Sequence, residues 1–409
     1  MQLKIQFPRL LFSIIFIFGL HFFSSAQLKI LFDATKAESA GNADWIIDAD
    51  LHNLDWNPGP VTCSSSACHQ SNAQQFPTPV QPAVGISTTE TYWQGALSFW
   101  GLDCAFKGYQ VETLPALTGK ISFGDNTNTQ DLSNYNSFVV CEPNIKFTDV
   151  EKTAMLNFVR NGGGLFIISD HNISDRNNDG WDSPNIWNDF FQTNSTGNAN
   201  PFGMIFDLAN FSETSTNVST NSNADTILRP AAGTGWGNVS KVKWSNGTSI
   251  TINPVANSSV VSVIHQNTGS GNNKVMVAIS RYGNGKVVAV GDSSPFDDGT
   301  GDTQDNLFTG YNGDVTPNHR NLIMNATIWL MSSNYSTYIF NGNGSWNVAS
   351  NWLYNKMPPT TLLSGDQIII DPVANGHCLL NITQHIETGA TLTIAAGKDL
   401  IVQGNLNIQ

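Results

Sequence analysis

Charged residues are scarce in this sequence, and cations are scarcer than anions. Only 12% of the 409 residues are charged, with 32 acidic against 19 basic side chains and a formal net charge of −13. An acidic surface repels the phosphates of nucleic acids and of anionic membranes, so neither is expected as a partner. Such a surface suits neutral ligands or cations such as calcium, although solubility alone explains it equally well.

Cysteine is also rare, with five residues in the chain: Cys63, Cys68, Cys104, Cys141 and Cys378. No pair of them has the spacing of a zinc knuckle. Cys63 and Cys68 lie close together in a polar stretch, and disulfides persist outside the cytoplasm. We therefore expect these two residues to close a small ring, while the odd count leaves at least one thiol over.

Long apolar runs are absent after the first twenty residues. The N-terminus carries Lys4 and Arg9, an apolar run from Leu10 to Leu20, and small residues ending at Ala26. This order is typical of a secretory signal peptide, and the run is shorter than the roughly 20 residues that a membrane anchor needs. Residues 1–26 are therefore predicted to be a cleaved signal. The mature protein is expected outside the cytoplasm, secreted or at the cell surface, with no membrane insertion.

Continuous apolar runs alternate with amphipathic stretches between residues 27 and 336. The runs at 29–33, 138–141, 165–169 and 286–290 are predicted strands. Helices are predicted over 88–107, after Thr148 with a capping box completed by Glu151, and over 318–331. Strands buried on both faces and alternating with helices predict an α/β domain with a doubly wound, mostly parallel sheet.

Two regions depart from this pattern. Residues 191–270 are rich in Asn, Ser, Thr and Gly and are predicted to form a loop-rich β insertion. Residues 337–409 contain short alternating strands separated by glycine turns, which predicts a small all-β unit, either a sandwich or the first coils of a β-solenoid. A solenoid ending at Gln409 would expose an unpaired edge. We therefore expect either a partner there or a longer natural chain.

Three stretches together resemble the class I glutamine amidotransferase-like superfamily, in its trehalose-utilisation-type branch. They are residues 29–33, the segment 138–171 with Gly162-Gly-Gly before its apolar strand, and residues 286–292. The resemblance implies a flavodoxin-like sheet with a site above the carboxyl ends of its strands. The amidotransferases carry a nucleophilic cysteine in the turn after the central strand, where this sequence has Asp170-His171. Without a thiol, amidotransferase activity is excluded. The C-terminal pattern looks like an accessory module of secreted bacterial proteins.

Polar residues follow each predicted strand of the parallel sheet. They are Asp33, Glu142, Asp170 with His171, and Asp292. Because the carboxyl ends of parallel strands meet at one edge, these side chains are expected to converge. One interpretation is acid/base catalysis by His171 with Asp170 or Glu142, with Asp33 near the substrate.

A second interpretation is a divalent-cation site. Asp175, Asp179, Asp292 and Asp297 supply oxygen ligands near glycine turns, which favours Ca²⁺ over Zn²⁺, although the full calcium-loop pattern is missing. A third interpretation is that these aspartates cap turns and helices, as Asp does in most loops.

These patterns lead to one leading hypothesis and one alternative. The leading hypothesis is a secreted hydrolase with a cation-binding site of carboxylates and histidine. It acts on an extracellular carbohydrate or small-molecule substrate, with Trp181 as a stacking surface for a sugar ring. The alternative is a non-catalytic glycan-binding or cell-surface protein whose amidotransferase-like fold has lost its chemistry.

Overall fold

The computed structural model describes most of the chain after the predicted signal peptide. It covers residues 27–40, 43–45, 47, 84–85, 87–88, 93, 95–116, 118–299, 308–314, 316, 318–332, 337–355, 357–362, 366–387 and 390–409. The predicted signal peptide and the predicted pair Cys63 and Cys68 lie outside these residues. Within them, no helix combines the length and the apolar character needed to cross a membrane.

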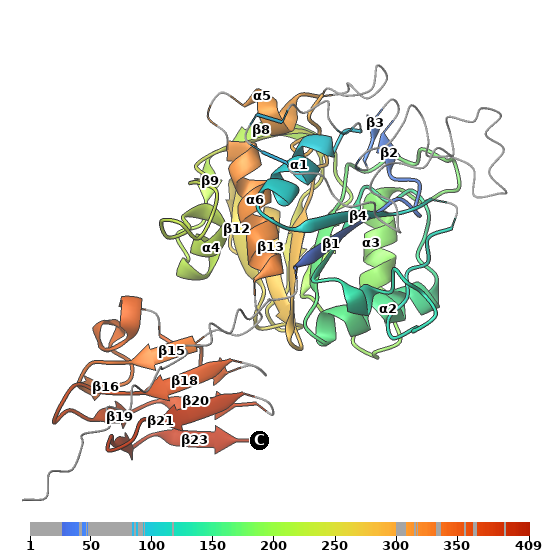
Figure 1. The fold of residues 1–409 in the computed structure, drawn as a ribbon. Coiled ribbons are helices and arrows are strands. Elements are labelled where there is room, and N and C mark those ends of the chain that lie inside the picture. Colours follow the sequence, from blue (N-terminus) through green and yellow to red (C-terminus); the bar gives the residue numbers. More distant parts are fainter. Residues whose placement is uncertain are drawn as a thin grey trace, which may run out of the picture.

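Five parallel strands form one side of the main sheet (Figure 1). They are β1 (Lys29–Asp33), β4 (Gln110–Leu114), β5 (Ser137–Cys141), β6 (Gly164–Ile168) and β14 (Gly285–Val290). Their spatial order is β4-β1-β5-β6-β14. Numbered along the chain, this order is 2-1-3-4-5, so the chain reverses its direction of travel across the sheet at β1. The predicted α/β class with a parallel central sheet is confirmed.

An antiparallel extension continues the sheet beyond β14. It consists of β13 (Asn273–Tyr282), β11 (Ile250–Ile252), β7 (Met204–Phe206), β12 (Val261–Ser270) and β9 (Asn217–Val218). Four of these strands come from the predicted insertion 191–270. That region is therefore largely part of the main sheet, because β11 and β12 both pair with β13. Two further strands, β8 (Phe211–Ser215) and β10 (Val242–Gly247), pair only with each other.

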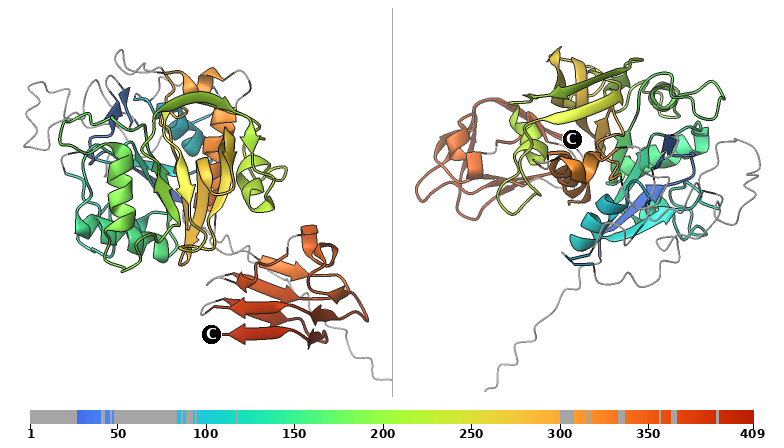
Figure 2. Two further views of the ribbon diagram at one scale, coloured as in Figure 1. Left: turned by 180° about the vertical axis from the view of Figure 1, so that it is seen from behind. Right: turned by 90° about the horizontal axis from the view of Figure 1, so that it is seen from above.

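Helices cover both faces of the sheet (Figure 2). On one face α1 (Ser98–Phe106) and α6 (Asn318–Met331) pack against it, and on the other lie α2 (Asp149–Arg160) and α3 (Ser183–Gln192). Alternate residues of β6 point to opposite faces, so Phe166 joins the core under α1 and α6 while Leu165 joins the core under α2 and α3. The shorter elements are α4 (Asp225–Leu228), α5 (Gly310–Gly313) and the hairpin β2 (Ser39–Ala40) with β3 (Ala43–Asp44).

Local sequence signals explain where α2 begins and ends. The Thr148 side chain accepts from the backbone of Glu151, whose carboxylate accepts from the backbone of Thr148, so the predicted capping box is confirmed. Gly162 follows the helix with φ +116, a left-handed conformation that glycine adopts without strain. By contrast, the helix predicted over 88–107 begins only at Ser98. Its apolar pattern includes Trp93, which is buried outside the helix.

The C-terminal residues form three stacked coils, each with three short strands. Every strand pairs in parallel with the equivalent strand of the next coil, which is the arrangement of a β-solenoid. The coils pack around Phe340, Trp346 and Trp352. The strands are β15 (Thr337–Phe340), β16 (Gly344–Ser345) and β17 (Thr361–Leu362) in the first coil; β18 (Gln367–Ile370), β19 (Cys378–Leu380) and β20 (Thr383–Ile386) in the second; and β21 (Thr391–Ile394), β22 (Leu400–Val402) and β23 (Asn405–Ile408) in the third.

Candidate active site

A group of carboxylates lies at the carboxyl edge of the parallel strands. Asp33 ends β1, Glu142 directly follows β5, Asp170 lies just beyond β6, and Asp292 just beyond β14. All four are buried, with exposed fractions between 0% and 4%. In open α/β sheets this edge is the usual ligand site, at the point where the strand order reverses. The structure therefore brings Glu142, Asp170 and Asp292 together at the predicted edge.

Glu142 occupies a strained turn. Its φ is +48, in the left-handed region that a residue with a side chain adopts only at a cost of about 1–2 kcal/mol. Its Oε2 accepts hydrogen bonds from Trp45 Nε1 at 2.6 Å and from Ser293 Oγ at 2.9 Å. The sharp turn at this edge is therefore at Glu142, one strand away from the Asp170-His171 turn that the family resemblance indicated.

Glu142 and Asp170 form a coupled pair. Oε1 of Glu142 and Oδ2 of Asp170 contact the same nitrogen of Arg176, so the two carboxyl groups are neighbours. Burial raises the pKa of Glu142, and burial together with the charges of Glu142 and Asp292 holds the pKa of Asp170 well above its usual range. Arg176 Nη2 lies 3.3 Å from an oxygen of each, and its positive charge opposes both shifts. The raised pKa values of both acids and the single guanidinium beside them favour a state in which one acid is protonated and the other ionised.

His171 connects this pair to the protein surface. Its Nε2 lies 3.4 Å from Asp170 Oδ2, and its Nδ1 lies 2.6 Å from the carbonyl oxygen of Asn172. A carbonyl oxygen only accepts, so Nδ1 carries a proton and Nε2 faces the carboxyl group. The His171 side chain is 14% exposed and that of Arg176 28%. The more open side of the site is therefore the side of these two residues.

Asp33 belongs to a second buried acidic pair. Its carboxyl group interacts with that of Glu38, and its Oδ1 accepts from the backbone and the hydroxyl of Thr35. Burial raises the pKa of both acids, most strongly that of Glu38. Both residues are almost fully enclosed. These contacts do not favour the predicted role of Asp33 in substrate binding.

The four predicted metal ligands are occupied by backbone hydrogen bonds. Asp292 accepts from Ser245 and Ser294, Asp297 from Gly299 and Phe308, Asp175 from Asp179 and Gly180, and Asp179 from Trp181. No group of three or more His, Cys, Asp and Glu side chains in the described part of the chain is arranged to hold a metal ion. The geometry of these four residues thus favours the third interpretation, in which they stabilise turns. Burial raises the pKa of both Asp292 and Asp297 to about 7.

Trp181 does not present a free ring face. It packs partly against the core beneath α2 and α3, and Lys146 Nζ lies 3.7 Å from its ring centroid. This ammonium covers one face of the indole ring. The prediction of an exposed stacking surface is therefore not supported at this residue.

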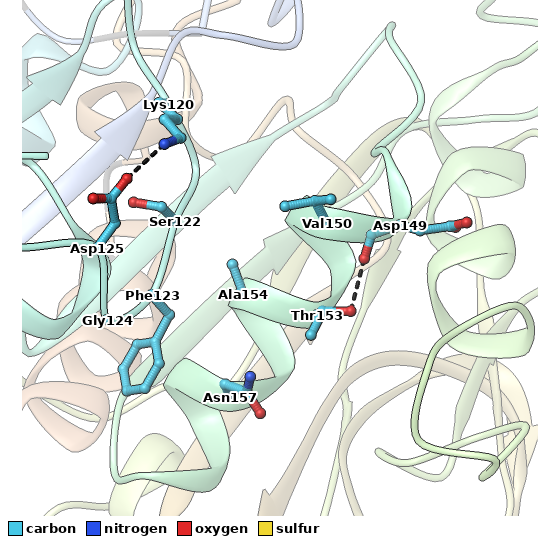
Figure 3. Close-up of a pocket in the computed structure, with 10 residues that line it drawn as sticks. All are labelled: Lys120, Ser122, Phe123, Gly124, Asp125, Asp149, Val150, Thr153, Ala154 and Asn157. Carbon is cyan, nitrogen blue, oxygen red and sulfur yellow. Dashed lines mark hydrogen bonds and ion pairs between the residues drawn. The ribbon is translucent and has the colours of Figure 1, made fainter. Parts of the chain in front are cut away.

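A separate groove lies between the loop 120–125 and the first turns of α2 (Figure 3). Its volume is about 520 Å³. Lys120 and Asp125 form an ion pair on the loop side, while Val150, Ala154 and Asn157 line the helix side. None of the predicted site residues lines this groove. We therefore centre the candidate site on the carboxylates of the sheet edge.

Four contacting residues were not assigned to the site from the sequence; one of them is Arg176, which contacts both Glu142 and Asp170. The other three, Glu38, Trp45 and Ser293, reach the site from segments without a recognisable motif. Trp45 is 97 positions from Glu142, and Ser293 is 151 positions from it. Of these three residues, only Ser293 could have been predicted from the sequence, because it directly follows Asp292 at the end of β14.

Comparisons with known proteins give a family but no activity. A family model described as "Domain of unknown function (DUF4350)" matches residues 90–308. No curated protein matches. Similar solved structures include the "mmIFT52 N-terminal domain", with 13% identity, a TM-score of 0.37, and 56% of this chain and 88% of that chain covered.

Two further structures have comparable similarity. The cytoplasmic protein STM3548 from Salmonella typhimurium has 13% identity, a TM-score of 0.34, and coverage of 57% of this chain and 86% of its own. A ThuA-like protein from Parabacteroides merdae has 14% identity, a TM-score of 0.32, and coverage of 56% and 81%.

Proposed function

Because this chain belongs to the family described as Domain of unknown function (DUF4350), we propose its function from the site itself: a hydrolase outside the cytoplasm that cleaves an ester bond on an extracellular carbohydrate. The observation that carries this proposal is the neighbouring pair of Glu142 and Asp170, both in contact with Arg176, with Glu142 at a strained position. The 2-1-3-4-5 strand order supports a flavodoxin-like fold.

The pair supplies both an acid and a base. The ionised carboxyl group takes a proton from a water molecule, whose oxygen attacks the carbonyl carbon of the ester. The protonated carboxyl group donates to the carbonyl oxygen, so the tetrahedral intermediate is neutral. The carbon–oxygen bond to the alcohol then breaks as the carbonyl group re-forms: the alcohol oxygen receives the proton taken from water, and the former carbonyl oxygen returns its proton to the carboxylate that donated it. Two acids that share one proton perform this chemistry in aspartic proteases.

The spacing of the acids favours an ester over a glycosidic bond. Glycosidases of the two-carboxylate type hold their acids about 5–5.5 Å apart when retaining and about 6.5–9.5 Å apart when inverting. Glu142 and Asp170 are direct neighbours, since one oxygen of each lies 3.3 Å from the same Arg176 nitrogen. They therefore leave no room for a sugar ring or a water molecule between them, whereas an ester carbonyl approaches such a pair from one side.

Turnover of model substrates tests the proposal. The purified mature chain is assayed with aryl esters, acetylated polysaccharides and aryl glycosides, together with Glu142→Gln, Asp170→Asn and the control Asp131→Asn. Asp131 is also buried, but it caps the loop 122–133 instead of facing the site. We expect ester hydrolysis to fall at least about 100-fold in the two site variants and to persist in the control.

Two other outcomes have defined meanings. Ester turnover that survives Glu142→Gln places the chemistry elsewhere and rejects the proposed site. No turnover on any substrate, with retained binding to a glycan array, supports a non-catalytic glycan-binding protein. The near-complete burial of Glu142 and Asp170 is the observation that favours this second candidate.

A further inference from the structure

Two exposed apolar side chains lie close to the more open side of the candidate site. Ile173, which follows His171 by two residues, is 81% exposed, and Leu208 is 55% exposed. We call these two side chains the apolar patch. A single exposed apolar residue is common on protein surfaces and needs no explanation. These two differ because they come from distant segments that meet beside the imidazole, and because one of them has a strained backbone.

Hydrogen-bonding groups bring the two segments side by side. The backbone N–H of Asn172 donates to the carbonyl oxygen of Ala209 at 2.9 Å, and the amide nitrogen of Asn210 lies 3.3 Å from Nδ1 of His171. These contacts match residue 171 with 210 and residue 172 with 209, which is the register of two antiparallel segments. The next pair in that register is the apolar patch, so its two side chains belong to the same surface as His171.

Ile173 keeps its side chain there at an energetic cost. Its φ is +69, in the left-handed region, where a β-branched residue is a genuine outlier. Asp182 holds this conformation, because its Oδ2 accepts from the Ile173 backbone at 2.8 Å while its Oδ1 caps α3. Glycine or asparagine would occupy the turn with less strain. Because such strain collects at ligand-binding sites, an exposed isoleucine at this position is better explained by a ligand than by folding.

The surroundings of the apolar patch suit an uncharged ligand. Residues 172–174 and 208–212 contain no charged side chain. An ester on a carbohydrate has two sides, a sugar with its hydroxyl groups and an acyl group, and of these only the acyl group can be apolar. Burial of an apolar chain against the patch removes both surfaces from water and is therefore favourable. The acyl group is the part of the substrate that the patch fits.

We propose that the apolar patch binds the acyl group of the substrate, so that esters with an extended apolar acyl chain are preferred over acetyl esters. This inference rests on the proposed ester hydrolysis at Glu142 and Asp170. Asp170, His171 and Ile173 lie in one short stretch of chain after β6. An acyl chain that starts at the carboxyl pair must therefore pass the imidazole to reach Ile173, which an acetyl group is too short to do.

The preference for acyl length tests the proposal. The values of kcat/KM are compared for an aryl hexanoate and an aryl acetate with the same leaving group. We expect the hexanoate to be favoured at least about tenfold, because the patch covers its additional methylene groups. This ratio should fall at least about fivefold in Ile173→Asn and in Leu208→Ser, whereas Ile173→Leu, which stays apolar, should retain it. The matched control is Val255→Asn, which removes an apolar side chain that is 97% exposed outside the candidate site.

A thermal melt separates a lost contact from a lost fold. Asparagine adopts the left-handed region more readily than isoleucine does. The Ile173→Asn variant should therefore melt at or above the temperature of the wild type, although its preference for the hexanoate is reduced. A reduced preference in a variant that is at least as stable as the wild type assigns the effect to the missing apolar contact.

Binding of a neutral analogue separates this inference from the proposed function. Hexanamide and acetamide are added to Glu142→Gln, with and without Ile173→Asn, and binding is followed by ligand-observed NMR. Tighter binding of hexanamide that Ile173→Asn weakens supports the apolar patch, even if no ester is hydrolysed, in which case only the proposed function fails. Ester hydrolysis without a preference for the hexanoate, or with a preference that Ile173→Asn and Leu208→Ser leave unchanged, overturns the inference alone. Equal binding of the two amides, together with no ester hydrolysis, rejects both.

Discussion

The Nε2 atom of His171 lies 3.4 Å from Oδ2 of Asp170. Because Nδ1 of the same ring donates to the Asn172 carbonyl oxygen, the imidazole is held with Nε2 toward the acid. The ring therefore lies between the buried pair of Glu142 and Asp170 and the more open side of the site. In the proposed reaction it carries protons between that pair and solvent, and it does not contact the ester.

Replacing His171 should therefore slow the reaction less than replacing Glu142. We expect His171→Ala to lower kcat about tenfold with little change in KM, because the proton relay is interrupted while the acids remain. Added imidazole should restore part of the rate in this variant and leave the wild type unaffected. A loss as complete as that of Glu142→Gln, without rescue by imidazole, would instead assign His171 to the reacting atoms.

Stability should fall as pH rises from about 4 to about 7. Burial raises the pKa of Asp292 and Asp297 to about 7, whereas an unfolded Asp has a pKa of about 3.9. Between these values the unfolded state is ionised while the folded state keeps its protons, so the free energy of unfolding decreases with pH and levels off above the higher value. Interactions with Ser122, Ser133 and the loop backbone lower the pKa of Asp131 to about 2, so its contribution is lost only in stronger acid.

Urea unfolding at several pH values, followed by near-ultraviolet circular dichroism, measures this dependence. The expected decrease between pH 4 and pH 7 is on the order of 2 kcal/mol or more, since one pKa unit corresponds to about 1.4 kcal/mol. In the Asp292→Asn variant, the free energy of unfolding should decrease less between pH 4 and pH 7 than in the wild type, whatever the absolute stability of the variant. A flat profile from pH 4 to pH 8 in the wild type would contradict the prediction.

At position 142, glycine should be tolerated better than alanine. Both Glu142→Gly and Glu142→Ala remove the acceptor of the Trp45 and Ser293 hydrogen bonds. Only alanine retains the cost of a left-handed φ of +48. We expect the glycine variant to be more stable by about 1 kcal/mol in urea unfolding, the reverse of the usual order in helices and strands. Equal stabilities would indicate a backbone that relaxes at this turn.

Loss of the α2 cap should destabilise the protein. Thr148→Ala removes the hydroxyl that accepts from the Glu151 backbone, and such changes cost about 1 kcal/mol. Thr148→Ser keeps this acceptor and serves as the control. The difference between the two variants in urea midpoint is the measurement, and a Thr148→Ala protein as stable as the Thr148→Ser protein would show that the cap contributes nothing.

Much of the fold could be predicted because local signals and the global arrangement agree. The apolar runs of β1, β5, β6 and β14 are strands in the structure, and the capping box at Thr148 begins α2 as predicted. The strand pairings of residues 191–270 could not be predicted in the same way. Their polar, alternating sequence fits an edge strand or a separate hairpin equally well, and only the hydrogen bonds to β13 decide between them.

The candidate site was predictable in position but not in its contacts. Strand ends identify Glu142, Asp170 and Asp292, because parallel strands finish at one edge. The positive φ of Glu142 has no signature in the sequence, since neither Glu142 nor its neighbours is a glycine. The contacts of Trp45 and Ser293 depend on tertiary packing over long sequence separations, and spacing along the chain carries no information about them.

The position of β1 limits how the protein can be divided for study. The family match begins at residue 90, but β1 precedes it in the chain and lies between β4 and β5 in the sheet. A recombinant fragment of residues 90–308 would therefore lack an interior strand, leaving both neighbours with unpaired backbone and an apolar gap. It would also lack α6, which covers one face. Expression of the domain should start no later than residue 27 and extend through residue 332.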